Sequence, residues 1–171
     1  NDRSNEYYNN GYRDARNGQP LDPSFSIHYA DGHADGTQYR IGHQRGLNDQ
    51  TAGSFHSDRM EGHQDALDEM YDRGYDEGRG DRRPSSNHSS YRSGYVRGQE
   101  RRLYVAGDND GYENRRPASP LNRIYMEGFR DGQNNLMYDE GYDDGRAGYR
   151  WRYPNDRHYM DGYYKGANSR R

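Results

Sequence analysis

Tyrosine, glycine and charged residues alternate along this chain with the period of a helix. In the segment 138–148, YDEGYDDGRAG, a tyrosine is followed by glycines three and seven positions later and by a second tyrosine at the fourth. On a helix these four positions fall within about 100° of arc and form one stripe. On a strand, tyrosine and glycine would lie on opposite faces. The pattern therefore predicts α-helices.

The same motif occurs ten times. We number its tyrosine position 0, so that small residues stand at positions 3 and 7 and an aromatic residue at position 4. Positions 1, 2, 5 and 6 are mostly charged, and we expect them to face away from the stripe. Glycine fills 18 of the 20 small positions although only 22 of 171 residues are glycine, and Ala15 and Ala66 fill the other two. The copies begin at Tyr8, Tyr29, Tyr39, Arg59, Tyr71, Tyr91, Tyr104, Tyr125, Tyr138 and Tyr159.

The spacing between copies divides them into five pairs. The step inside a pair is constant at 20 or 21 residues, whereas the step to the next pair varies from 10 to 13 residues. We interpret the constant step as the inside of a folded unit. The chain is therefore predicted to be one all-α array over 1–171, solenoid-like or rod-like, of five helical hairpins with ten short helices. The repeats cover residues 8–38, 39–70, 71–103, 104–137 and 138–171.

Capping residues and prolines agree with helices separated by loops. Asp22-Pro23 and Ser119-Pro120 each read as an N-cap followed by a first-turn proline. Four other prolines stand in the long connections, where a helix must end. The pattern leaves open whether the short joints are turns or continuous helix. The four prolines are Pro20, Pro84, Pro117 and Pro154.

Glycine in the middle of a helix costs about 1 kcal/mol relative to alanine, so its repeated use needs a reason. Small residues four apart allow two helix backbones to approach closely, with the tyrosine rings beside the contact. We therefore expect the motif glycines to lie at helix–helix contacts. The glycines predicted for this role are Gly11, Gly32, Gly36, Gly42, Gly46, Gly62, Gly74, Gly78, Gly94, Gly98, Gly128, Gly132, Gly141, Gly145, Gly162 and Gly166.

The last repeat resembles the ribosome modulation factor family of bacteria. That family has an aromatic-x-x-Gly-aromatic-x-x-Gly helix, a proline-containing loop and a second helix of the same type. The resemblance implies a two-helix unit and, as an alternative function, association with ribosomes or RNA. This chain departs from the family in its five tandem units and in its acidic balance. The matching residues are Tyr138, Gly141, Tyr142, Gly145, Gly148, Pro154, Tyr159, Gly162 and Tyr163.

Composition limits the classes of partner. Only 28% of residues are hydrophobic and 31% are charged, which is typical of disordered chains, but 19 tyrosines supply bulky contact area. The net charge is −3, with 25 basic and 28 acidic residues interspersed, so no basic stripe predicts nucleic acid as a partner. No apolar run approaches the ~18 residues of a membrane helix.

Candidate chemistry is sparse. His33, His43 and His63 stand at position 4, where other copies have tyrosine or phenylalanine, so we interpret them as aromatic substitutes that bind no metal. The segment 107–113, GDNDGYE, begins like a calcium loop with Asp108 and Asp110. It has Ser119 where such a loop needs glutamate, so we predict no calcium site there.

No arrangement of nucleophile, base or phosphate-binding loop stands out, so we expect neither an enzyme nor a cofactor. Asn87 is the only Asn-x-Ser/Thr acceptor for N-glycosylation, which makes glycans possible partners.

The two terminal copies are as rich in tyrosine and glycine as the inner ones. Repeat arrays without polar caps associate end to end and polymerise when the rotation does not close. We therefore predict a self-assembling structural subunit that polymerises head to tail through its Tyr/Gly helix faces. Because the sequence begins with Asn rather than Met, as after removal of a signal peptide, we expect an extracellular fibre or surface layer.

Overall fold

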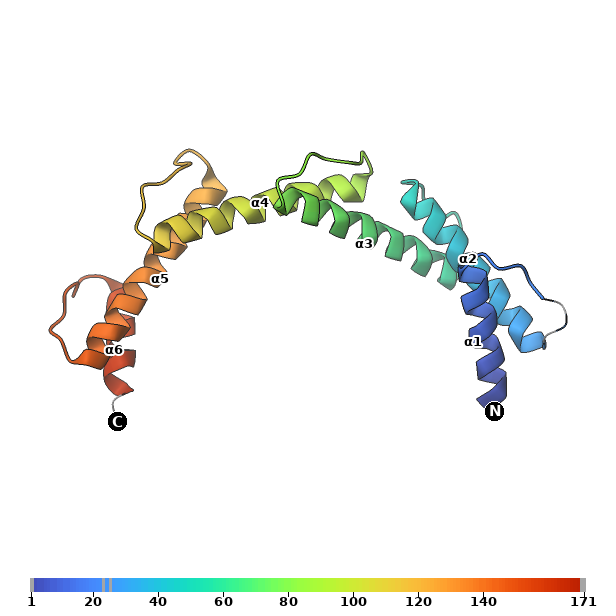
Figure 1. Cartoon of the computed structure of the whole chain (residues 1–171), viewed down its shortest axis with the longest axis horizontal. Helices are drawn as coiled ribbons and strands as arrows, with labels where there is room; N and C mark the ends of the chain where they lie inside the picture. Colours follow the sequence, from blue (N-terminus) through green and yellow to red (C-terminus); the bar gives the residue numbers. More distant parts are fainter. Residues whose placement is uncertain (1, 23, 25, 170–171) are drawn as a thin grey trace. The chain divides into compact units, whose positions relative to one another are not determined.

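The computed structural model describes residues 2–22, 24 and 26–169, and these residues form six α-helices and no strand (Figure 1). The prediction of an all-α protein is confirmed. The helices are α1 (Asp2–Arg16), α2 (Ile27–Leu47), α3 (Ser57–Arg79), α4 (Ser89–Tyr112), α5 (Arg123–Ala147) and α6 (Arg157–Asn168).

The prediction of ten short helices is wrong, because the short joints between copies are continuous helix. Each of the four inner helices carries two copies of the motif, as α2 does with Tyr29 and Tyr39, whereas α1 and α6 carry one copy each. The joints contain neither glycine nor proline, and residues such as Gln, Glu, Leu and Arg in them favour helix. The joints are 37–38, 67–70, 99–103 and 133–137.

Three helices begin with a capping side chain three residues before position 0. Ser26, Asn122 and Asp156 accept hydrogen bonds from the backbone N–H groups of Tyr29, Tyr125 and Tyr159. These bonds satisfy N–H groups that have no partner inside the helix.

The caps predicted at Asp22 and Ser119 are therefore wrong by three or four residues. Asp22 instead accepts a bond of 2.9 Å from the N–H of Ser24, in a turn before the helix. Pro23 lies outside the described residues.

The first helix of every repeat ends in the same way. Ten residues after position 0 of the first copy, the backbone adopts a left-handed conformation with φ between 52° and 77°. The following N–H then bonds to a carbonyl five residues earlier, as Tyr149 does to Asp144 at 3.0 Å. This is the geometry of a Schellman cap, which supplies donors to the last carbonyls of the helix. The left-handed residues are Gly18, Asp49, Asp81, Asn114 and Gly148.

The chain divides into two compact units, 1–98 and 99–171, and α4 contributes to both. In the first unit, α2 contacts α1 with its first half and α3 with its second half. The second half of α3 contacts the first part of α4. In the second unit, α5 contacts the remainder of α4 and then α6. Tyrosine is the commonest residue among the buried side chains, and Tyr91 and Tyr159 are fully buried.

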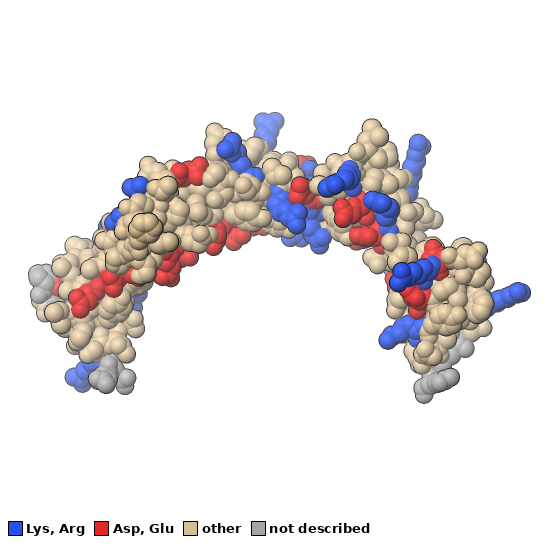
Figure 2. All heavy atoms as spheres, turned by 180° about the vertical axis from the view of Figure 1, so that it is seen from behind, with Lys and Arg blue, Asp and Glu red and all other residues tan. Residues whose placement is uncertain are grey.

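The exposed faces of the helices are strongly charged. Figure 2 shows acidic side chains gathered over the part of the molecule that α3 occupies. Five exposed acidic residues recur there every three or four positions, on one side of the helix. No helix in the described part of the chain has the length and apolar character to cross a membrane. The five residues are Glu61, Asp65, Asp68, Asp72 and Asp76.

Candidate functional site at the helix crossings

Each copy of the motif crosses its partner copy in the same repeat, and glycine meets carbonyl at the crossing. A Cβ atom on Gly141 would lie 2.0 Å from the carbonyl oxygen of Tyr159, and one on Gly162 would lie 2.0 Å from that of Tyr138. The relation is thus reciprocal, with each position-3 glycine against the position-0 carbonyl of the partner helix. It recurs in all five repeats, with Cβ-to-oxygen distances of 1.9 to 2.2 Å. Any larger side chain there would collide with backbone.

The position-7 residues extend the contact by one turn. A Cβ on Gly145 would lie 2.1 Å from the carbonyl oxygen of Tyr163, which stands at position 4 of the partner copy. The two alanines at this position, Ala15 and Ala66, are fully buried. They face Gly36 and Gly46, whose nearest carbonyl oxygens stand farther off, at 2.3 and 2.7 Å. One of the two position-7 residues of a crossing can therefore be alanine, provided that the other is glycine and the two helices lie slightly farther apart.

All sixteen glycines predicted for helix packing lie at these crossings, together with Gly107 and Gly111. Because the backbones are so close, the glycine Cα–H groups face carbonyl oxygens of the other helix. Such contacts are weakly attractive and recur where small residues line a helix interface. The close approach accounts for the repeated use of a residue that disfavours helix.

A second contact, between tyrosine and carboxylate, flanks the glycines and was not expected from the sequence. The position-0 hydroxyl donates a hydrogen bond to the position-6 carboxylate of the partner copy, as Tyr8 does to Asp35 at 2.7 Å. Position 6 therefore does not face away from the partner helix. The pairs are Tyr8–Asp35, Tyr29–Asp14, Tyr39–Asp65, Tyr91–Glu77, Tyr104–Asp131, Tyr125–Asp110 and Tyr159–Asp144.

The sequence carried a signal for this contact. Position 6 is acidic in seven copies, and in each of them the tyrosine opposite donates to it. The other three copies hold a base, namely Arg45, Arg97 or Lys165. Because position 6 is charged in every copy, the sequence alone suggests that it faces solvent. Only the position of the partner helix shows that its acidic residues accept a hydrogen bond from a tyrosine.

The tyrosine–carboxylate contacts raise the pKa of several of these tyrosines, and they help to lower the pKa of Glu77 and Asp144. The bond to Asp35, with burial, raises the pKa of Tyr8 to about 12. Burial, with the bond to Asp65, raises the pKa of Tyr39 to about 12. In the last repeat, the Arg152 guanidinium and then the Tyr159 hydroxyl lower the pKa of Asp144. The Tyr8 and Tyr39 phenols thus stay protonated donors, and Asp144 stays a charged acceptor.

The second copy of each pair also binds the connection between the two helices. The hydroxyl of Tyr159 accepts the N–H of Arg152 at 3.0 Å, and Tyr91 and Tyr125 hold their own connections in the same way. One turn later, the position-4 hydroxyl of Tyr163 donates to the carbonyl oxygen of Tyr149 at 2.7 Å. The loop is therefore fixed at two points to the second helix.

Two of the three histidines singled out in the sequence serve this loop contact. His33 Nε2 lies 2.8 Å from the carbonyl oxygen of Gln19, and His63 Nε2 lies 2.6 Å from that of Gln50. These carbonyls correspond to the one that Tyr163 binds. Histidine therefore replaces the hydroxyl of tyrosine as well as its ring. His43, in a first copy, stacks on Tyr39 and lies 3.2 Å from Glu69.

The remaining sequence candidates lie in ordinary surroundings. Residues 107–112 continue helix α4, so GDNDGYE does not form a loop of the calcium-binding kind. Asp110 accepts the hydroxyl of Tyr125. Asn87 is exposed in the connection between α3 and α4, where a glycan would find space.

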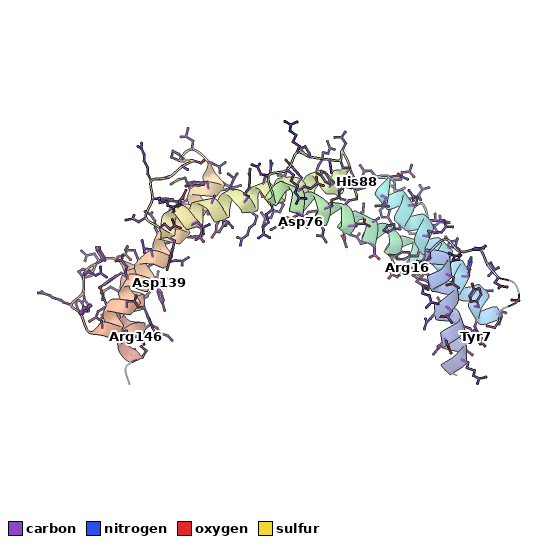
Figure 3. All side chains as sticks on the ribbon, in the orientation of Figure 1. Tyr7, Arg16, Asp76, His88, Asp139 and Arg146 are labelled. Atoms are coloured by element: carbon purple, nitrogen blue, oxygen red, sulfur yellow. The ribbon has the colours of Figure 1, made fainter. Side chains whose placement is uncertain are left out.

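In two places where consecutive repeats meet, the contact comes from the residue eight positions after position 0 of the first copy. Arg16, labelled in Figure 3 at the end of α1, places its guanidinium 3.8 Å from the ring centre of Tyr39, the first tyrosine of the next repeat. Tyr12 adds a tilted ring contact to Tyr39 at 6.2 Å. In the second unit, the equivalent Tyr112 donates to Asp139 at 2.8 Å. We call this contact the repeat junction.

No family model, no curated protein and no solved structure matches this chain.

Proposed function

We propose that the chain is a structural subunit that associates head to tail, through repeat junctions formed between copies, into a fibre or surface layer outside the cell. The observation that carries the proposal is the repeated use of one set of contacts. The glycine crossing occurs five times with nearly the same distances. The repeat junction, in turn, uses the same motif position at Arg16–Tyr39 and at Tyr112–Asp139.

The terminal copies of the motif cannot supply an open stripe for this association. Gly11 faces the carbonyl of Tyr29, and Gly162 faces that of Tyr138, so both terminal copies already have partners within the chain. Tyr159, in the last copy, is fully buried. Association through the Tyr/Gly faces would therefore first require a hairpin to open. The repeat junction offers a contact that needs no such change.

The two terminal repeats carry the residues needed to form one more repeat junction between two copies of the chain. The last repeat supplies the arginine and the first repeat supplies the tyrosine. Arg146, labelled in Figure 3, is the equivalent of Arg16 in the last repeat and is exposed. Tyr8 is the equivalent of Tyr39 in the first repeat and is half-buried. A guanidinium on a tyrosine ring contributes about 0.5–2 kcal/mol. Burial of neighbouring tyrosine surface must supply the rest of the affinity.

Sedimentation velocity over a concentration series tests the proposal. We expect the weight-average sedimentation coefficient to rise with concentration, and electron microscopy of the same samples to show linear assemblies. A single monomeric species at every concentration would contradict it.

One surface favours a second candidate, association with single-stranded RNA. The connection between α5 and α6 exposes Tyr149, Trp151 and Tyr153, with exposed Arg150 between the first two. Aromatic rings interleaved with arginine stack bases and contact phosphates. Binding of an oligonucleotide that weakens steeply with salt, and that is lost in Trp151→Ala, would support this candidate over the structural one.

A further inference from the structure

Three side chains with metal-binding atoms converge where the first two repeats meet. Asp35 comes from α2, His56 from the connection before α3, and Asp58 from the first turn of α3. One ligand atom from each lies within 4.8 Å of the other two. His56 Nε2 is 3.6 Å from Asp35 Oδ1, and His56 Nδ1 is 3.4 Å from Asp58 Oδ2. All three side chains are partly exposed, so an ion can reach them from solvent.

Histidine at position 56 occupies a place that favours a short polar capping residue. Residue 56 is the N-cap of α3, the place where Ser26, Asn122 and Asp156 accept a backbone N–H in three of the other repeats. The third repeat has His88 at this place, with Nε2 2.6 Å from the carbonyl oxygen of Gly46. His56 makes no side-chain capping bond. Loss of a good N-cap costs about 1 kcal/mol. The imidazole is directed instead toward the two carboxylates, which gives this substitution a chemical reason.

Two tyrosines of α1 support the carboxylates from the outer side. The hydroxyl of Tyr8 donates to Asp35 Oδ2 at 2.7 Å, which leaves Oδ1 directed at the imidazole. Tyr12, one turn further along α1, lies near Asp58. Hydrogen bonds to the ligating carboxylates are the usual means by which proteins orient metal ligands. The arrangement thus has a ligand set and a supporting layer drawn from three helices.

We propose that Asp35, His56 and Asp58 bind one divalent transition-metal ion of the zinc type. Two carboxylates and one imidazole suit Zn²⁺ or Mn²⁺, with water at the remaining positions, whereas Ca²⁺ and Mg²⁺ prefer ligands that are all oxygen. Only one ring nitrogen can face a single ion, so binding requires one carboxylate to shift toward it. The ion would fasten the start of α3 to α2 beside the end of α1, in addition to the Arg16–Tyr39 junction.

Calorimetric titration of the untagged protein with zinc chloride near neutral pH tests the site. We expect one saturable site per chain in the wild type. The decisive variant is His56→Ser, which removes the imidazole but supplies the cap residue found at Ser26. The fold is therefore retained, and zinc affinity should fall at least about tenfold. Asp58→Asn should weaken binding similarly.

Two controls separate this site from diffuse binding to charged surface. His28→Ala removes an exposed histidine at the start of α2, and Asp72→Asn removes an exposed carboxylate of the acidic face of α3. Both variants should bind zinc as the wild type does. Zinc should also raise the melting temperature of the wild type and not of His56→Ser. The proposal is overturned if no saturable site is found, or if His56→Ser binds zinc as tightly as the wild type.

Discussion

The hydroxyl of Tyr159 donates a hydrogen bond of 2.6 Å to Oδ2 of Asp144, and both side chains are buried where α5 and α6 cross. A buried carboxylate is costly unless it is paired and hydrogen-bonded. Here Arg152 provides two further bonds, at 2.6 and 3.1 Å. Asp144 therefore joins both helices and the loop between them, and it shows in one place how the tyrosine–carboxylate pairs complete a crossing.

Substitution of this carboxylate should destabilise the last repeat. We expect Asp144→Ala to lower the free energy of unfolding by about 1–3 kcal/mol, because the Tyr159 hydroxyl and the Arg152 guanidinium lose their acceptor. The neighbouring Asp143 is exposed, and Asp143→Ala should have little effect. Hydrogen exchange can localise the change, with faster exchange confined to residues 138–168. Equal exchange rates in the two variants would show that the pair contributes no stability.

Replacing a glycine at a crossing by alanine should lower the stability of the fold strongly, although alanine adds only one methyl group. A Cβ on Gly141 would lie 2.0 Å from a backbone oxygen that cannot rotate away. Gly141→Ala should therefore cost at least the roughly 1–3 kcal/mol of an overpacked core.

Gly80→Ala is the matched control for this substitution, because its nearest atom would be 3.2 Å away, at the end of α3. Urea denaturation followed by circular dichroism compares the two variants. A Gly141→Ala midpoint no lower than that of Gly80→Ala would refute the close crossing.

A stabilising substitution follows from the loop contacts. Position 4 of the second copy binds the loop carbonyl through His33, His63, Tyr95 and Tyr163, but the fourth repeat has Phe129 there. Phe129→Tyr should place a hydroxyl near the equivalent carbonyl and add about 0.5–1.5 kcal/mol. The reverse substitution, Tyr163→Phe, should remove a similar amount. Thermal unfolding measures both, and a lower melting temperature for Phe129→Tyr would contradict the equivalence of these positions.

Stability should fall at alkaline pH. The pKa values of Tyr8 and Tyr39 are raised from 10.0 to about 12 in the folded chain, so between pH 10 and pH 12 the unfolded chain loses protons that the folded chain keeps. The unfolded state then binds fewer protons, and stability decreases as pH rises through this window. Melting temperatures measured from neutral pH to pH 12 should therefore decline above pH 10. Tyr8→Phe should show a smaller decline, whereas an identical profile would contradict the assignment.

For Asp144, whose pKa is lowered in the folded chain, stability should instead fall as the pH decreases. Its contribution is present above the ordinary aspartate value of 3.8 and should be lost as pH falls below it. Melting temperatures measured in acid should therefore fall less in Asp144→Asn than in the wild type.

The stripe of Tyr138, Gly141, Tyr142 and Gly145 contains enough information to predict helix, because its period fits only a helical face. The length of the helices could not be read from it. A joint such as 67–70 lacks glycine and proline, but the motif by itself does not distinguish continuous helix from a short turn. The caps at Asp22 and Ser119 were misplaced because a favourable residue pair occurs one turn before the residue that caps.

The contacts of charged residues were harder to predict than those of glycine. Asp35 and Asp144 look like surface residues in sequence, and only the crossing geometry brings each of them to a tyrosine of another helix. The same holds for His56, because one of the two carboxylates beside it, Asp58, is two residues away in the sequence and the other, Asp35, is twenty-one residues away. Spacing along a helix predicts faces, but it does not give the register between two helices.

The proposed head-to-tail association has one direct test, sedimentation velocity of Arg146→Glu beside the wild type. Deleting α6 would be a poor test, because its glycines complete the crossing with α5. Arg146→Glu leaves that crossing intact and removes the cation proposed to lie on Tyr8 of the next copy. Arg150→Glu, an exposed change of the same charge in the nearby loop, is the control. The proposal predicts that Arg146→Glu stays monomeric at concentrations where the wild type and Arg150→Glu assemble. A wild type that never assembles, or an Arg146→Glu variant that assembles as readily as the wild type, would contradict it.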